Sequence, residues 1–437
     1  MILIHVPQIT SRVKYTCHFL FEELMRMPYT LTANKEEFLN SPLPKFAYGN
    51  EPVRDTLFFK ACPLLFESDI YKQKIEFKLW RKLPVFFPVN NEELPFDLFA
   101  ATFFLISRYE EYLPQGRDHH NRFRSEESTS YKGGFLDRPI INVWVNEFKS
   151  ILKREFPSLS FSAVQFSFTP TVDIDNAYAY KYKGGLRITL NLLEKLAQFK
   201  FKKFSDRIAV HAGYRRDPYD SYEKLSRIHK EYKIQPLYFI LLGDYGKYDR
   251  NLSPDNKKFI DLIKSLQSYA HIGLHPSYKS NGGNGQLAKE KKRLEKILGS
   301  TVEKSRQHYI KLEFPHTYRN LLAQGIKEDY SMGFPSKVGF RAGTSTPFYF
   351  FDLEKNETTS LKVFPFVMMD STLKYYMKFR SKEVIPYMTP IVEEMKRVGG
   401  NFVFVFHNES LGEAKMWKNW GDMYEKIIRL AISDSGE

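Results

Sequence analysis

Between residues 164 and 410, short and nearly continuous apolar runs alternate with segments in which apolar residues recur at helical spacing. The apolar runs cover residues 166–172, 236–242, 362–369 and 401–406. A strand that is apolar along its whole length is typical of a sheet covered on both faces, and strand–helix alternation is typical of parallel sheets. The pattern predicts an α/β fold built on a parallel sheet, either a barrel or a doubly wound sheet.

Two helices of this region are predicted from a proline that precedes an apolar periodic segment. Ser253-Pro254 comes before apolar residues that recur up to Leu266, and Thr389-Pro390 comes before a segment that ends at Gly399. Proline is favoured at the first position of a helix, where no N–H is needed for the helical ladder. We therefore expect helices that begin at residues 254 and 390.

The N-terminal third has a different pattern. It predicts a buried strand over residues 1–6, a helix over 11–25, loops and short elements in the proline-rich stretch 40–95, and a strongly apolar helix over 96–113. The polar run 115–128 is expected to be an exposed loop. We place a boundary near residues 150–162, which divides the chain into a smaller N-terminal α/β domain (1–155) and a second domain (156–437).

Composition narrows the class of protein. Of 437 residues, 43% are hydrophobic and 27% charged, which excludes wholesale disorder, and the two cysteines cannot form a disulfide framework. No stretch has the length of a membrane span, and the N-terminus does not have the pattern of a signal peptide. We expect a soluble, cytoplasmic protein without a membrane span.

The formal net charge is +14, and all of the excess lies beyond residue 150, because residues 1–150 hold equal numbers of basic and acidic residues. A basic half is compatible with an anionic partner, including nucleic acid. The lysines are scattered over predicted helix faces, however, and no basic–aromatic motif of a nucleic-acid-binding module is present. We expect no nucleic-acid partner.

Polar residues follow several of the predicted strands, where parallel α/β proteins place their working side chains. Asp173 and Asp175 end the first run and face the same side of the strand, which is compatible with a metal site or with a turn. His271 and His275 follow a second run, and two histidines four apart can meet on one metal ion. His407 ends the last long run, in a place suited to acid–base work or to a structural hydrogen bond.

Further polar side chains lie near the ends of other predicted strands. They are Arg306 and His308 in SRQHY, Arg341 in GFRAGTSTPF, and Asp370 in VMMDSTL. For both arginines, a buried structural ion pair is nearly as good an explanation as a role in the site.

Taken in order, these motifs resemble those of the polysaccharide deacetylases, carbohydrate esterase family 4. The resemblance covers residues 163–412 and rests on TPTVDIDNAYAY, IGLHPSY, SRQHY, GFRAGTSTPF and HNESL. The strings LISRYEEYLP and YKGGFLDRP resemble the extra N-terminal domain of a bacterial subgroup of that family.

The resemblance implies a distorted (β/α)7 barrel that holds one divalent metal ion, most often zinc, and acts on a glycan or amino-sugar substrate. It implies Asp175, His271 and His275 as metal ligands. Asp173 is the implied general base and His407 the implied acid, with Arg341 orienting Asp173 and Asp370 supporting His407. Tyr278, Arg306 and His308 are expected to bind substrate.

The function implied by the resemblance is hydrolysis of an N-acyl group, in most cases N-acetyl, on an amino sugar, polysaccharide or glycan precursor. Two spacings differ from the family pattern: Ile174 separates the two aspartates, and five residues separate Arg341 from Pro347. The alternative is therefore an inactive barrel that binds a glycan or a metal without turnover.

Overall fold

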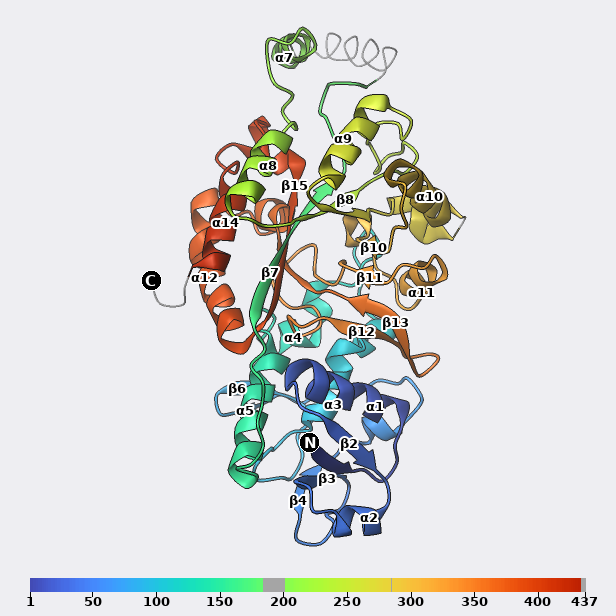
Figure 1. The fold of residues 1–437 in the computed structure, drawn as a ribbon, viewed down its shortest axis with the longest axis vertical. Helices are drawn as coiled ribbons and strands as arrows, with labels where there is room; N and C mark the ends of the chain where they lie inside the picture. The colour runs from blue at the N-terminus through green and yellow to red at the C-terminus, as the bar shows by residue number, and fades with distance from the viewer. Residues whose placement is uncertain (184–200, 284, 434–437) are drawn as a thin grey trace.

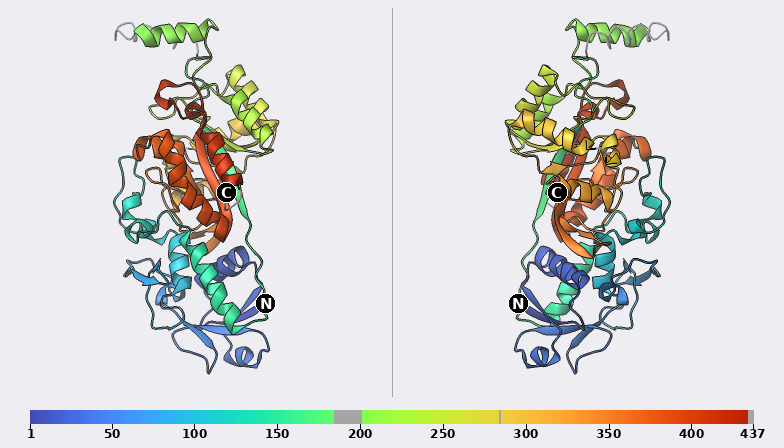
Figure 2. Two further views of the ribbon diagram at one scale, coloured as in Figure 1. Left: turned by 90° about the vertical axis from the view of Figure 1, so that its left-hand side faces the viewer. Right: turned by 90° about the vertical axis from the view of Figure 1, so that its right-hand side faces the viewer.

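The computed structural model describes residues 1–183, 201–283 and 285–433. Most of residues 1–155, here called the N-terminal unit, lies at the lower end of the molecule in Figure 1, and its segment around α4 (Thr129–Lys132) reaches up beside the larger C-terminal unit. The two side views in Figure 2 show the same arrangement. No helix in the described part of the chain is both long enough and apolar enough to cross a bilayer.

The N-terminal unit is built on a four-stranded parallel sheet in the order β2-β1-β3-β4. Its strands are β1 (Ile2–His5), β2 (Tyr29–Thr32), β3 (Lys45–Gly49) and β4 (Leu57–Lys60), with a separate hairpin of β5 (Lys78–Trp80) and β6 (Leu83–Val85). Its helices are α1 (Ser11–Cys17), α2 (Lys35–Asn40), α3 (Leu98–Ile106), α4 (Thr129–Lys132) and α5 (Ile140–Glu155). Short helical turns are η1 (His18–Leu24), η2 (Pro63–Phe66), η3 (Tyr109–Tyr112) and η4 (Ser125–Glu127).

The strongly apolar helix predicted over 96–113 is shorter in the structure. All nine residues of α3 are buried, and the Asp97 side chain caps the helix by accepting a hydrogen bond from the Ala100 N–H. The helix ends because Arg108 adopts a left-handed backbone conformation (φ 54°), stabilised by its ion pairs with Glu110 and Glu111. The chain then continues as η3.

The C-terminal unit contains a nine-stranded sheet in the order β12-β13-β11-β10-β9-β8-β7-β15-β14, which confirms the predicted α/β class. Neighbouring strands are parallel except for β12 and β13. The strands are β7 (Phe166–Ile174), β8 (Leu237–Ile240), β9 (His271–Leu274), β10 (Lys304–Ser305), β11 (Glu328–Asp329), β12 (Phe348–Asp352), β13 (Glu357–Val363), β14 (Phe366–Met369) and β15 (Gly400–His407).

The sheet curls toward a barrel, as the short connection between β13 and β14 requires. The single strand predicted over 362–369 is wrong, because β13 ends at Val363 and β14 starts at Phe366 near the opposite end of the strand order. Two intervening residues can span at most about 10 Å, so the two ends of the sheet approach each other. The described strands β12 and β14 do not pair, and the (β/α)7 count stays a prediction.

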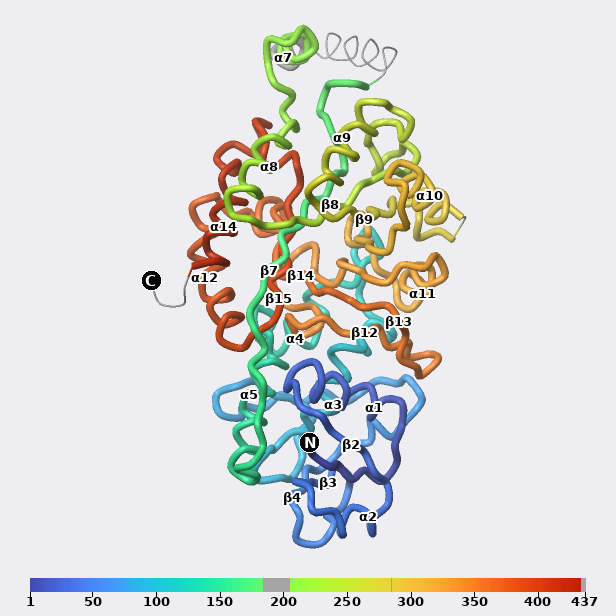
Figure 3. Tube along the Cα trace, viewed as in Figure 1, coloured from blue at the N-terminus to red at the C-terminus, as the bar shows by residue number. Residues whose placement is uncertain are grey.

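Helices flank the curled sheet, as the tube in Figure 3 shows, except α7 (Phe201–His211), which lies at the top of the view and away from the sheet. The others are α8 (Tyr222–Glu231), α9 (Lys257–Gln267), α10 (Gln286–Leu298), α11 (His316–Ala323), α12 (Ser381–Val398), α13 (Asn408–Leu411) and α14 (Met423–Ile432). Short turns are η5 (Tyr278–Gly282), η6 (His308–Ile310), η7 (Thr372–Tyr376) and η8 (Lys415–Trp417).

Both predicted helix starts are wrong by several residues. Helix α9 begins after Asn256, whose side chain accepts hydrogen bonds from the N–H groups of Lys258 and Phe259. Helix α12 begins at Ser381 and contains both Pro386 and Pro390. A side-chain cap therefore determines one start, and tertiary packing carries the other helix through two prolines.

The N-terminal unit packs directly on the C-terminal sheet. Tyr15 donates a hydrogen bond to the Tyr349 carbonyl (2.6 Å), and the rings of Phe103 and Phe351 meet edge to face at 5.2 Å. A buried ion pair between Glu111 and Arg341 joins the units (Nη2–Oε2 2.5 Å). The division of the chain into domains at residue 155 stays a prediction.

Candidate functional site

The chemically active side chains gather at the carboxyl ends of neighbouring strands. Asp173 is the penultimate residue of β7, and Asp175 directly follows this strand. His275 follows β9, and His407 ends β15. The carboxyl ends of parallel strands meet at one edge of the sheet. Residues more than 200 positions apart in the sequence therefore meet here.

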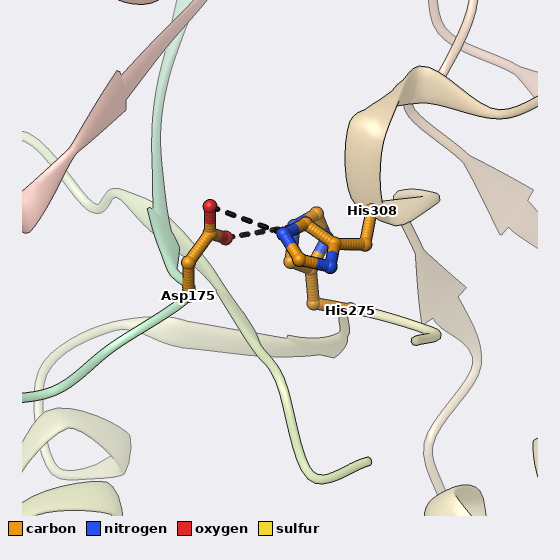
Figure 4. Close-up of side chains that lie close together, drawn as sticks. All are labelled: Asp175, His275 and His308. Carbon is orange, nitrogen blue, oxygen red and sulfur yellow. Dashed lines mark ion pairs between the residues drawn. The ribbon is translucent and has the colours of Figure 1, made fainter. Parts of the chain in front are cut away.

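One carboxylate and two imidazoles form the centre of the site. Oδ1 of Asp175 lies 3.0 Å from Nε2 of His275, and its Oδ2 lies 3.3 Å from Nε2 of His308 (Figure 4). Ligands of a tetrahedral zinc ion, each at about 2.0–2.1 Å from the metal, lie roughly 3.3 Å apart. In the described part of the chain, Asp175, His275 and His308 form a group that could hold a metal ion.

The hydrogen bonds of the two histidines leave the Nε2 atoms free for a metal. Nδ1 of His275 lies 2.5 Å from the Arg306 carbonyl oxygen, which can only accept, so Nδ1 carries the proton. Nε2 of the neutral ring is then an acceptor that faces a carboxylate oxygen. Oδ1 of Asp175 is buried and receives no hydrogen bond from the described residues. Two acceptors at 3.0 Å repel each other unless a cation or a proton lies between them.

His308 is oriented in the same way by a different partner. Its Nδ1 lies 2.9 Å from Oδ1 of Asp249, a carboxylate that is itself buried. Burial opposes a charge on the ring, but the carboxylates of Asp175 and Asp249 outweigh it and raise the pKa of His308 to about 9. The cluster thus attracts positive charge, either as a proton or as a metal ion.

The structure does not bring His271 to this cluster. His271 is the exposed first residue of β9, whereas His275 follows the last residue of the same strand. In a strand, four residues span roughly 13 Å, so His271 and His275 lie at opposite ends of β9. His308, which we expected to bind substrate, lies instead beside Asp175.

The two arginines also differ from expectation. Nη1 of Arg306 donates to Oδ1 of Asp173 (2.9 Å) and to the Thr171 hydroxyl (2.6 Å), so Arg306 occupies the place expected of Arg341. Arg341 is buried and donates to both carboxylate oxygens of Glu111, at 2.9 and 2.5 Å. For Arg341, the structure therefore agrees with the alternative given in the sequence analysis, a buried structural ion pair.

His407 and Asp370 form a pair at the other side of the cluster. Nδ1 of His407 lies 2.6 Å from Oδ1 of Asp370, and the His407 N–H donates to Oδ2 of the same carboxylate (2.7 Å). Burial opposes a charged ring, but Asp370 raises the pKa of His407 well above its usual value. Nε2 of His407 lies 3.8 Å from Oδ2 of Asp175, so the ring faces the centre of the site.

A cavity of about 660 Å³ opens over these residues. Asp173, Asp175, His275, His308 and His407 line its acidic and imidazole part. The remaining wall is rich in aromatic side chains, namely Tyr219, Tyr248, Tyr309, Tyr375 and Tyr376. Tyrosine rings of this kind suit flat, partly apolar ligands such as sugar rings.

Tyr278 is not among the residues that line the cavity, but it packs against one of them, Tyr248. Its N–H donates to Oδ1 of Asp249 (2.9 Å), and its ring is 4.3 Å from that of Tyr248. Sequence reasoning missed Asp249, because a single aspartate in a loop carries no spacing signal. His308 is singled out in SRQHY, but the sequence does not show that it lies beside Asp175 and His275.

The N-terminal part of the chain matches a family model. Residues 2–157 match a family of unknown function, DUF7033. No curated protein matches the chain.

Solved structures give weak similarity over 60–63% of the chain. A Mycobacterium smegmatis protein assigned to the polysaccharide deacetylases is 14% identical (TM-score 0.39) over 63% of this chain and 88% of that one. A polysaccharide deacetylase from Bacillus cereus is 12% identical (TM-score 0.28; 60% of this chain, 89% of that one). A 4-alpha-glucanotransferase from Thermococcus litoralis is 16% identical (TM-score 0.36; 62% and 38%). Similarity at this level does not indicate which reaction the chain performs.

Proposed function

We propose that this protein is a metal-dependent amide hydrolase that removes an N-acyl group from an amino sugar or a glycan containing one. The observation that carries the proposal is that two groups of side chains meet at one cavity. They are the Asp175–His275–His308 cluster and the Asp370–His407 pair. A metal cluster beside a separately oriented imidazole suits hydrolysis of a carbonyl compound. The motif resemblance to polysaccharide deacetylases supports the same reaction.

Asp175, His275 and His308 would hold the divalent ion. A donor set of two imidazole nitrogens and one carboxylate oxygen is typical of catalytic zinc sites, which keep a further position open. Such an ion acidifies water and polarises a carbonyl oxygen. The Arg306 carbonyl and the Asp249 carboxylate would act as the outer partners that fix the two rings.

Asp173 is the residue we assign as general base. Its carboxylate is buried, lies on the cavity wall and is oriented by Arg306. Arg306 directs one carboxylate oxygen of Asp173, which would accept a proton from the attacking water. Arg306 is therefore a positioning residue in this proposal.

His407 is the residue we assign as general acid. Its Nδ1 is bonded to Asp370, which leaves Nε2 directed to the cavity. The carboxylates around it raise its pKa, which favours the protonated, acidic form of the ring. The proton on Nε2 can pass to the amine nitrogen as the C–N bond breaks.

The proposal is tested by acetate release from N-acetylated amino sugars and their oligomers, using full-length protein loaded with zinc, cobalt or manganese. We expect release in the wild type, and Asp173→Asn and His407→Gln should retain the metal and lose about 100-fold or more in kcat. Undiminished turnover in both variants would refute the assigned roles. Failure of every N-acylated sugar with a fully loaded metal site would refute the reaction.

A further inference from the structure

The cavity has a cationic rim outside the metal cluster. Lys247 and Arg250 line the cavity, and both are exposed residues of the loop that follows β8. No carboxylate among the described residues lies within ion-pair distance of either side chain. The Lys247 ammonium lies over the Tyr248 ring, 5.0 Å from its centroid. Two positive charges without a carboxylate partner therefore border the same cavity as the candidate metal ligands.

The loop that carries these cations is anchored to the site. Asp249 accepts hydrogen bonds from Nδ1 of His308 and from the Tyr278 N–H, both at 2.9 Å, and its own carbonyl accepts from the Gly246 N–H (2.7 Å). Nε of Arg250 donates to the Lys247 carbonyl, which ties the two cationic residues to each other. The residue that orients His308 thus also positions the cationic rim.

The N-terminal unit completes the wall beside this rim. Arg122, on the cavity lining, donates to the Tyr309 carbonyl (2.7 Å) and to the Tyr376 hydroxyl (3.2 Å). Asp118 neutralises its charge, with Nη2–Oδ2 at 2.7 Å. Arg122 is therefore a structural part of the wall, and Lys247 and Arg250 remain as the charges available to a ligand.

The acidic residues of the cavity do not cancel these charges. Asp173 is paired with Arg306, and Asp175 lies between two imidazoles. Glu409 lies on another part of the wall, hydrogen-bonded to Tyr219, and burial raises its pKa. The cavity thus combines an acidic, metal-binding centre with a cationic rim and an aromatic wall.

We infer that the substrate is an N-acylated amino sugar that carries an anionic substituent, a phosphate or a carboxylate, which Lys247 and Arg250 bind while the acyl group faces the metal cluster. This inference rests on the proposed function and adds the substrate class. Arg and Lys bind both kinds of anion, with arginine able to donate two parallel hydrogen bonds. The rim would select the anionic sugar over its neutral analogue.

The test compares three sugars that differ only at carbon 6: N-acetylglucosamine, N-acetylglucosaminuronic acid and N-acetylglucosamine 6-phosphate. Their binding to the metal-loaded, full-length protein is measured by calorimetry at low and at high salt. The variant is K247A/R250A. The matched control is K292A/K296A, which removes the same charge from exposed positions of α10 that do not line the cavity.

We expect at least one anionic sugar to bind about tenfold or more tightly than N-acetylglucosamine at low salt, because hydrogen bonds to charged groups are the stronger ones. K247A/R250A should lose this preference and leave the neutral sugar within about twofold, whereas K292A/K296A should keep the preference. Which anionic sugar gains shows whether phosphate or carboxylate is the natural group.

Equal binding of the three sugars, no binding of any, or an unchanged preference in K247A/R250A would each overturn the inference. Binding is read without turnover, so the outcome is separate from that of the acetate-release assay. Tight, rim-dependent binding of an anionic sugar without acetate release would overturn the proposed reaction and leave the binding site in place.

Discussion

His308 and His271 make opposite predictions about metal binding, and a pair of alanine variants separates them. His308 faces Asp175 at 3.3 Å, whereas His271 is exposed at the far end of β9. We predict that His308→Ala loses the metal ion and that His271→Ala keeps it. Both variants remove one imidazole, so a nonspecific effect of losing a histidine is controlled.

The expected magnitude follows from the number of ligands. Structural zinc sites with four protein ligands bind with an apparent free energy of about 10–16 kcal/mol, or about 3 kcal/mol for each ligand. Losing one ligand of the Asp175–His275–His308 set should therefore weaken metal binding by about 100-fold or more. His308→Ala also leaves the buried Asp249 carboxylate without its imidazole partner, so the fold must be checked separately.

The assay is elemental mass spectrometry after dialysis against buffer of fixed free zinc, followed by competition with a chelator of known affinity. Circular dichroism and the unfolding midpoint show whether each variant is folded. One zinc per chain in His271→Ala and none in folded His308→Ala would agree with the structure. Loss of zinc in His271→Ala, together with full retention in His308→Ala, would refute the ligand assignment.

Three further predictions concern residues outside the metal cluster. Arg341→Met should lower the free energy of unfolding by about 3 kcal/mol, because it breaks a buried ion pair with Glu111. The zinc content of this variant should be unchanged. Loss of turnover without loss of stability would contradict this structural role. Arg122→Gln should weaken sugar binding several-fold without changing the zinc content, because it removes donors to Tyr309 and Tyr376; unchanged affinity would show that this wall does not shape the cavity. Burial lowers the pKa of His229 to about 4. Between pH 6.5 and pH 4, the unfolded chain therefore takes up a proton that the folded chain does not. The free energy of unfolding should fall by about 3 kcal/mol in total as the pH decreases over this range. Denaturant unfolding at pH 7 and pH 4.5 should show a smaller loss in His229→Gln than in the wild type, and equal losses would contradict the assignment to His229.

The strands that position the site were largely predictable. Strands β7, β8 and β15 fall within or beside apolar runs, because a strand with both faces covered needs apolar residues at consecutive positions. The same signal failed at 362–369, where the last two residues of β13 and the whole of β14 lie in one stretch of sequence whose pattern predicts a single strand. The pattern of apolar residues cannot show that the two residues between β13 and β14 carry the chain from one end of the sheet to the other.

Helix boundaries were less predictable than helix existence. The sequence indicated helices near α9 and α12, but both starts were wrong. Asn256 caps α9 with its side chain, and α12 extends through Pro386 and Pro390 because its apolar face packs on the sheet. Local propensity is a small term that packing overrides.

By itself, the sequence determined that carboxylates and imidazoles stand at the ends of parallel strands, because an apolar run and the polar residue after it are adjacent in the chain. Asp173, Asp175, His275 and His407 could be named in this way. Only the tertiary structure decided which of the other side chains join them. Asp173 pairs with Arg306 and not with Arg341, whose partner Glu111 is 230 residues away. Such pairings depend on the order of strands and on the contact between the two units, and neither is encoded at short range.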